Sequence, residues 1–178
     1  MKNRRKFLAA GALMAALGFA GFAPLSAHAQ TVMKAADVHP AGYPTVVAVE
    51  NMGKKLDAAT QGRIKFQMFP GGVLGDEKTM IEQTQFGAIQ ILRTSLGPVG
   101  NVVPEVNVFN MPFMFRDEAH LNAVLDGPIG QEMLDKISAS PARMVALAFT
   151  VAGSRSLYTK KPVRKPEDLK GQKIRMMG

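Results

Sequence analysis

The sequence contains no cysteine, and this absence excludes several structural and chemical devices at once. Without cysteine the chain can form no disulfide, offer no thiolate to a metal ion and carry no lipid on a processed N-terminal cysteine. Histidine is also scarce, with three in 178 residues. We therefore expect a protein that is stabilised by its own core and that uses no metal and no cofactor.

Acidic residues are missing from the first 29 positions, which combine a basic start with an apolar run from residue 7 to about residue 24. The small-residue pattern Ala27-His28-Ala29 follows the run. This order predicts a secretory signal peptide over residues 1–29, cleaved before Gln30. A transmembrane anchor is the alternative, but several glycines and a proline interrupt the run. Arg4-Arg5-Lys6 resembles a twin-arginine motif, so both export routes stay open.

Cleavage would leave 18 basic and 14 acidic residues, a net charge of +4. A nucleic-acid-binding protein would need a clustered basic stripe, and this small surplus is spread along the chain. We therefore expect no nucleic-acid partner. The balance suits a soluble periplasmic domain that meets small organic anions.

Motifs of catalysis are also missing. No Gly-x-Ser-x-Gly sequence occurs, and the loop 71–75 lacks the lysine and hydroxyl residue of a phosphate-binding P-loop. Only His39 and His120 remain after cleavage. The sequence therefore favours a binding protein over an enzyme.

Alternating strand and helix patterns in the first half predict a right-handed α/β layer structure. Apolar residues of 43–59 recur at intervals of three and four, which predicts a helix that Gly62 ends. Residues 63–69 alternate as a strand with one covered face. Asp76 is placed to cap a helix that reaches about residue 86. Two more strands are expected over 32–36 and 88–92.

The second half predicts further elements of the same kind. Pro112 excludes a regular helix within the apolar stretch 107–115. The patterns that follow predict two short helices and three strands, at residues 117–125 and 128–137 for the helices and 143–150, 151–158 and 173–177 for the strands.

Five segments together resemble the DctP-type solute-binding subunits of TRAP (tripartite ATP-independent periplasmic) transporters. They are Phe69–Gly75, Ile81-Glu82-Gln83, Met111–Phe115, Gly153-Ser154-Arg155 and Asp168–Arg175. Their order and spacing match the family across almost the whole processed chain.

This resemblance implies a periplasmic binding protein-like fold, with two α/β domains, hinge strands and a ligand cleft between them. Residues 30–150 would form most of domain one, and residues 151–178 the hinge and an incomplete start of domain two. A full member is about twice as long, as two domains of ordinary size require. We therefore expect a truncated chain that exposes apolar surface and binds organic acids weakly or not at all.

Arginine is the side chain best suited to a ligand carboxylate, because it is always charged and offers paired donors. Arg175 lies on an expected strand among apolar residues, where its alternative role is a solvated edge charge. The resemblance implies that the matching arginine pairs with the ligand carboxylate. Arg155 matches a second arginine near the cleft, with an ordinary charge after a turn as its alternative.

Polar residues follow two expected strands at their carboxyl ends, where open α/β sheets present ligand groups. Thr94 and Ser95 follow strand 88–92, although loop capping would also explain them. Asp37 and His39 follow the first strand and can accept hydrogen bonds from hydroxyl groups, as a sugar acid would require. Turn formation by Asp37 and an exposed His39 are the alternatives.

Residues 36–44 look like the start of uronate-binding members of the family, so glucuronate or galacturonate is our hypothesis beside a C4-dicarboxylate. In the expected mechanism two domains close over the acid, and the closed form docks on TRAP membrane permease subunits. A periplasmic sensor or scaffold with the same fold is the competing function. Adjacent permease genes would favour transport, and an adjacent histidine kinase would favour sensing.

Overall fold

The computed structural model describes residues 30–154 and 156–175. The expected signal peptide, Arg155 and the end of the last expected strand lie outside the described residues. Within the described part, no helix combines the length and the apolar character needed to cross a membrane.

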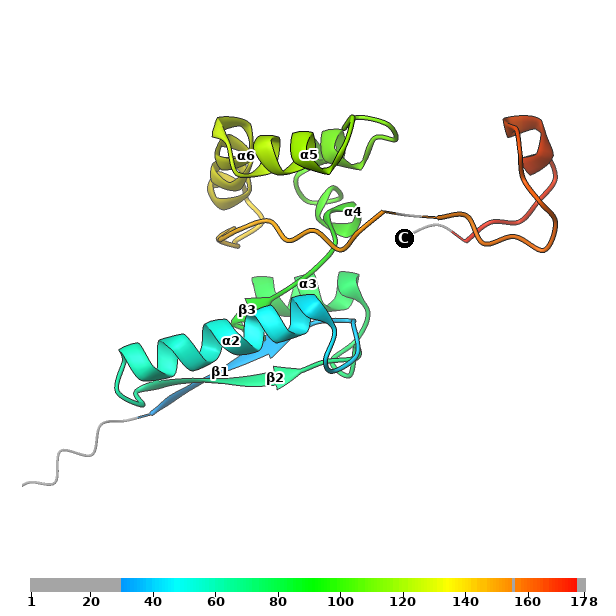
Figure 1. The fold of residues 1–178 in the computed structure, drawn as a ribbon. Coiled ribbons are helices and arrows are strands. Elements are labelled where there is room, and N and C mark those ends of the chain that lie inside the picture. The colour runs from blue at the N-terminus through cyan, green and yellow to red at the C-terminus, as the bar shows by residue number, and fades with distance from the viewer. Residues whose placement is uncertain (1–29, 155, 176–178) are drawn as a thin grey trace, which may run out of the picture.

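A three-stranded parallel sheet with the order β2-β1-β3 forms the first layer (Figure 1). β1 (Thr31–Ala36) pairs along its whole length with β2 (Ile64–Phe69), and its last two residues pair with β3 (Ile91–Leu92). The expected α/β architecture is confirmed, although β3 is shorter than the predicted strand 88–92. Because all three strands are parallel, their carboxyl ends share one edge of the sheet.

Two helices accompany this sheet. α2 (Pro44–Ala59) packs against β2, with Gly53 so close to Phe66 that a Cβ on the glycine would come within 2.8 Å of the phenylalanine Cβ. α3 (Glu77–Gln85) begins after Asp76, whose carboxylate accepts a 2.8 Å hydrogen bond from the Thr79 backbone N–H, as the sequence predicted. That bond lowers the pKa of Asp76 below its usual value.

Short helices form the rest of the packed structure. α4 (Leu96–Val99) and the 3-10 helix η1 (Pro104–Asn110) lead to a helical pair, α5 (Glu118–Leu125) and α6 (Pro128–Ala139), which confirms both predicted helices. η1 occupies the first four residues of the stretch 107–115, in which no regular helix was expected, and it ends before Pro112. The larger core cluster joins α3, α4, η1 and α6 through Ile81, Val99, Val103, Val106, Met133, Ile137 and Ala142.

The C-terminal segment, residues 143–175, corrects three predictions. No strand forms over 143–150, over the described part of 151–158 or over 173–175, and the one short element is the 3-10 helix η2 (Pro166–Leu169). Residues 144 and 146 face the core cluster while 145 and 147 are exposed, so the side chains still alternate as in a strand. No strand in the described part of the chain pairs with this stretch, and a strand needs such a hydrogen-bonded neighbour.

Candidate functional site

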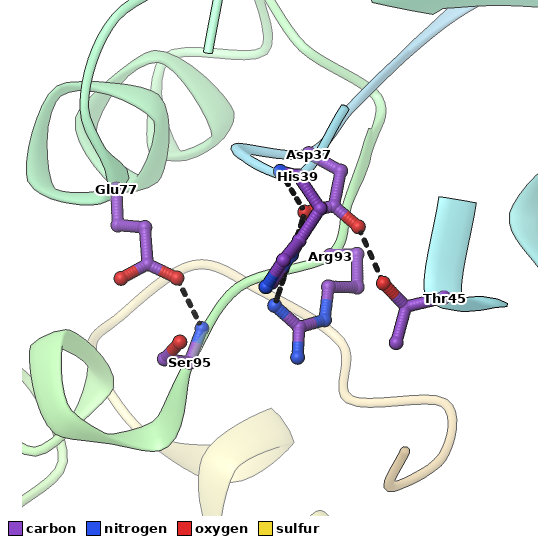
Figure 2. Close-up of polar contacts among 6 residues, drawn as sticks. All are labelled: Asp37, His39, Thr45, Glu77, Arg93 and Ser95. Carbon is purple, nitrogen blue, oxygen red and sulfur yellow. Dashed lines mark hydrogen bonds and ion pairs between the residues drawn. The ribbon is translucent and has the colours of Figure 1, made fainter. Parts of the chain in front are cut away.

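The carboxyl edge of the sheet brings together two loops that are far apart in the sequence. Asp37 follows β1, and Arg93 follows β3. The Arg93 backbone N–H donates a 3.0 Å hydrogen bond to the Ala36 carbonyl and so prolongs the pairing of these strands. The side chains of Asp37 and Arg93 therefore meet just beyond the sheet (Figure 2).

Asp37 is fully buried and organises the loop after β1. Its Oδ1 accepts a 2.9 Å hydrogen bond from the His39 backbone N–H, and its Oδ2 accepts one of 2.9 Å from the Thr45 hydroxyl in α2. A buried carboxylate requires such partners, because water is not available to solvate it. Asp37 thus forms the expected turn and also fastens the start of α2 to the sheet edge.

His39 lies between this carboxylate and Arg93. Its Nδ1 is 2.7 Å from Asp37 Oδ1 and 3.1 Å from Arg93 Nη1. Nδ1 cannot donate to the carboxylate and accept from the guanidinium at once, so the shorter, charge-assisted contact assigns its proton toward Asp37. In the neutral ring this leaves Nε2 as an acceptor. The ring also stacks on Tyr43, with 4.2 Å between centroids and 15° between planes.

Arg93 is the buried cation of this cluster, with a side chain that is 9% exposed. Its Nη1 lies 3.8 Å from Asp37 Oδ1, close enough for an ion pair but too far for a hydrogen bond. Its Nε is buried and has no hydrogen-bond partner among the described residues. An unpaired buried donor is costly in a folded protein, and a ligand oxygen would remove that cost.

The loop after Arg93 holds two further polar residues. Thr94 Oγ1 is buried and likewise has no hydrogen-bond partner within the described ranges. The Ser95 backbone N–H donates a 2.8 Å hydrogen bond to Glu77 Oε1, which ties the start of α3 to this loop (Figure 2). Ser95 occupies the position before α4, but its side chain makes no capping hydrogen bond.

Four of the six predicted site residues lie in the loops at this edge: Asp37 and His39 follow β1, and Thr94 and Ser95 follow β3. Arg175 is exposed and belongs to no strand or helix. Arg155 lies outside the described residues. The pairing of these two arginines with a ligand carboxylate therefore stays a prediction.

Sequence reasoning missed three residues of the cluster: Arg93, Thr45 and Glu77. Arg93 directly follows the apolar stretch 88–92, so the argument that selected Thr94 applies to it equally. Thr45 and Glu77 carried no comparable signal. Each lies in the first turn of a helix, and its role depends on where that helix lies relative to the sheet.

Known proteins resemble this chain in both sequence and structure. A TRAP periplasmic solute binding protein from Pseudomonas putida F1, solved with bound D-glucuronate, is 64% identical; the match covers 79% of this chain and 46% of that one, with a TM-score of 0.76. A second one, from Xanthobacter autotrophicus Py2 with bound β-D-galacturonate, is 47% identical, with 78% and 46% covered and a TM-score of 0.74.

A solute-binding protein of Chromohalobacter salexigens is 35% identical over 142 residues, which is 79% of this chain and 42% of the relative. The chain thus spans somewhat less than half the length of the relatives it matches. These relatives are binding proteins and not enzymes, which confirms the preference for binding over catalysis. Residues 35–178 match the family described as "Bacterial extracellular solute-binding protein, family 7" (DctP). Since this match covers most of the sequence, the chain belongs to that family.

Proposed function

We propose that this protein captures a uronate, such as glucuronate or galacturonate, in the periplasm and delivers it to the membrane permease of a TRAP transporter. The observation that carries the proposal is the cluster of Asp37, His39 and Arg93 at the carboxyl edge of a parallel sheet, where Arg93 Nε and Thr94 Oγ1 are buried polar atoms without a hydrogen-bond partner among the described residues. Relatives with bound uronates support the same class of ligand.

The chemistry of a uronate divides between one carboxylate and several hydroxyl groups. Hydroxyl groups can donate to His39 Nε2 and can either donate to or accept from Thr94 Oγ1. Arg175 and Arg155 are assigned to the carboxylate, because an arginine fork matches its two oxygens. The binding step involves no covalent change, only closure of the protein around the acid.

A C4-dicarboxylate is the less favoured ligand because of the charge at the sheet edge. Asp37 is already buried there, and within the described residues Arg93 is the cation that balances its negative charge. A second ligand carboxylate near this edge would add a buried charge without a partner. A hydroxyl-bearing acid with a single carboxylate avoids that cost.

Ligand-observed NMR, which detects even weak affinities, tests the ligand class. We expect glucuronate and galacturonate to bind more tightly than succinate, and Arg175→Ala to weaken uronate binding about 100-fold by removing a charge-assisted pair. Arg164→Ala removes an exposed arginine from the same segment and serves as the matched control. The measurement uses a full-length homologue with the same residues, since we expect the present chain alone to bind weakly or not at all. Equal affinity in wild type and Arg175→Ala would remove Arg175 from the proposed site, and binding of no acid by that homologue would reject the function.

Delivery to a permease needs a separate experiment. Cells that carry or lack the gene are supplied with labelled glucuronate, and uptake is measured directly. Loss of uptake in the deleted strain is the expected result. Normal uptake combined with a lost transcriptional response to glucuronate would favour the sensor function instead.

A further inference from the structure

We propose that Arg93 binds an uncharged oxygen of the ligand, such as a sugar hydroxyl, and not its carboxylate. Arg93 would then make the protein select hydroxylated acids over plain ones. This inference rests on the proposed function, since it requires a sugar acid in the site, and it specifies which part of the ligand Arg93 contacts.

The first argument is the hydrogen-bonding state of the guanidinium. Nη1 faces the His39 ring at 3.1 Å, but Nδ1 of that ring already carries the proton that it donates to Asp37, so Nη1 has no acceptor there. Nε has no partner among the described residues. Arg93 is therefore positioned by its 3.8 Å ion pair with Asp37, and its buried Nε is a donor that no described residue satisfies.

The second argument is charge balance. Asp37 is fully buried and the Arg93 side chain nearly so, and their opposite charges cancel. A carboxylate placed against Arg93 would leave a net negative charge in this poorly solvated place, which is unfavourable. A hydroxyl oxygen accepts the same hydrogen bond without changing the net charge. The nearby Asp37 thus converts Arg93 from a carboxylate partner into a donor to neutral oxygens.

The third argument is rigidity. Asp37 fixes His39 from one side and Tyr43 stacks on its ring, so the ring that faces Arg93 has a defined position. A donor held between fixed groups discriminates between ligands better than one on a mobile side chain, because less order must be gained on binding.

The test uses Arg93→Lys, which keeps the positive charge near Asp37 but removes the Nε–H. Binding of D-glucuronate and its monodeoxy analogues is measured by titration with wild type and variant. We expect the variant to bind glucuronate about tenfold more weakly. For wild type, one monodeoxy analogue should bind about tenfold more weakly than glucuronate. For the variant, this analogue and glucuronate should bind equally well, because the deoxy change and the substitution remove the same hydrogen bond.

Arg63→Lys is the matched control. The exposed Arg63 donates from its Nε to the Thr60 carbonyl at 3.2 Å, on a different part of the molecule, so its replacement should leave glucuronate affinity unchanged. If Arg93→Lys does not fold, the double variant Asp37→Asn/Arg93→Gln removes both charges together. This variant should likewise bind glucuronate and one monodeoxy analogue with equal affinity.

Three results would overturn the inference, and they are distinguishable. Unchanged glucuronate affinity in Arg93→Lys would remove Arg93 from the site and leave the proposed function standing. An equal loss for glucuronate and every deoxy analogue, without coupling to any hydroxyl, would assign Arg93 to the carboxylate or to the fold. Failure of a full-length homologue with the same residues to bind any uronate would reject the proposed function and the inference with it.

Discussion

Residues 31–142 and the C-terminal segment differ in how their apolar side chains are used. In the first region Val106 is completely buried in the core cluster, whereas in the second Val145 and Leu147 are 74% and 66% exposed. Both regions contain many apolar residues. The difference is that strands and helices of the first region find neighbours, while the extended stretch 143–150 finds no paired strand in the described part of the chain. Apolar character alone does not make a strand.

Asp37→Ala should have the largest effect on stability, because it removes a fully buried carboxylate from the packed region 31–142. The change removes the acceptor of Thr45 and His39 and leaves Arg93 buried without an opposite charge. We expect a loss of about 3–5 kcal/mol in the free energy of unfolding, measured by urea denaturation. Asp135→Ala, at an exposed position of α6, should change stability by less than about 0.5 kcal/mol. Equal effects of the two changes would contradict the described burial of Asp37.

A matched pair of valines measures the difference between the two regions directly. Val106→Ala should cost about 1.5–3 kcal/mol, since Val106 is fully buried. Val145→Ala should stay within about 0.5 kcal/mol, because most of that side chain is in water. The free energy of unfolding is again the measurement. A large loss from Val145→Ala would mean that the C-terminal segment is packed in solution.

Gly53→Ala tests the contact between α2 and β2. The added methyl group would come within 2.8 Å of Phe66 Cβ, which cannot rotate away, so the helix must shift. We expect a loss of about 1–3 kcal/mol in spite of the better helix propensity of alanine. Lys54→Ala, an exposed neighbour on the same helix, is the control and should be nearly neutral. A stabilised Gly53→Ala protein would rule out the close packing.

The smallest effect concerns the cap of α3. The Thr79 N–H lowers the pKa of Asp76, so the ionised cap stabilises the fold above the ordinary value of 3.8, and this contribution is lost as the pH falls through the lowered pKa. Asp76→Asn keeps a capping oxygen that does not titrate. Melting temperatures measured from neutral to acidic pH should therefore fall less steeply for the variant than for wild type. Parallel curves would exclude a role for Asp76 ionisation.

The sequence alone predicted those elements whose stability depends on residues nearby in the chain. The periodicity of residues 43–59 predicted α2, and Asp76 predicted the start of α3, because a helix and its cap depend on near neighbours. The strand prediction over 143–150 failed because a strand depends on a partner elsewhere in the chain. Side-chain alternation is present there, and the hydrogen-bond ladder is not.

The candidate site shows the same division. Asp37, His39 and Thr94 could be selected because each lies within three residues of the end of a predicted strand. The ion pair between Asp37 and Arg93 and the bond from Thr45 were not predictable, because they depend on how β1, β3 and α2 meet in space. The sequence could have indicated Arg93 as a site residue, but it could not indicate that Arg93 pairs with Asp37.

The strand order β2-β1-β3 also bears on the time course of folding. β1 is the first strand in the chain and the central one in the sheet, so the site is complete only when β3 docks on it. His39 and Arg93 are 54 positions apart, and contacts that close long loops form late. Variants of Arg93 should therefore accelerate unfolding more than they slow folding, which stopped-flow experiments can resolve. By this account the contact of Asp37 and His39 with Arg93 is the last part of the sheet edge to form and the first to open.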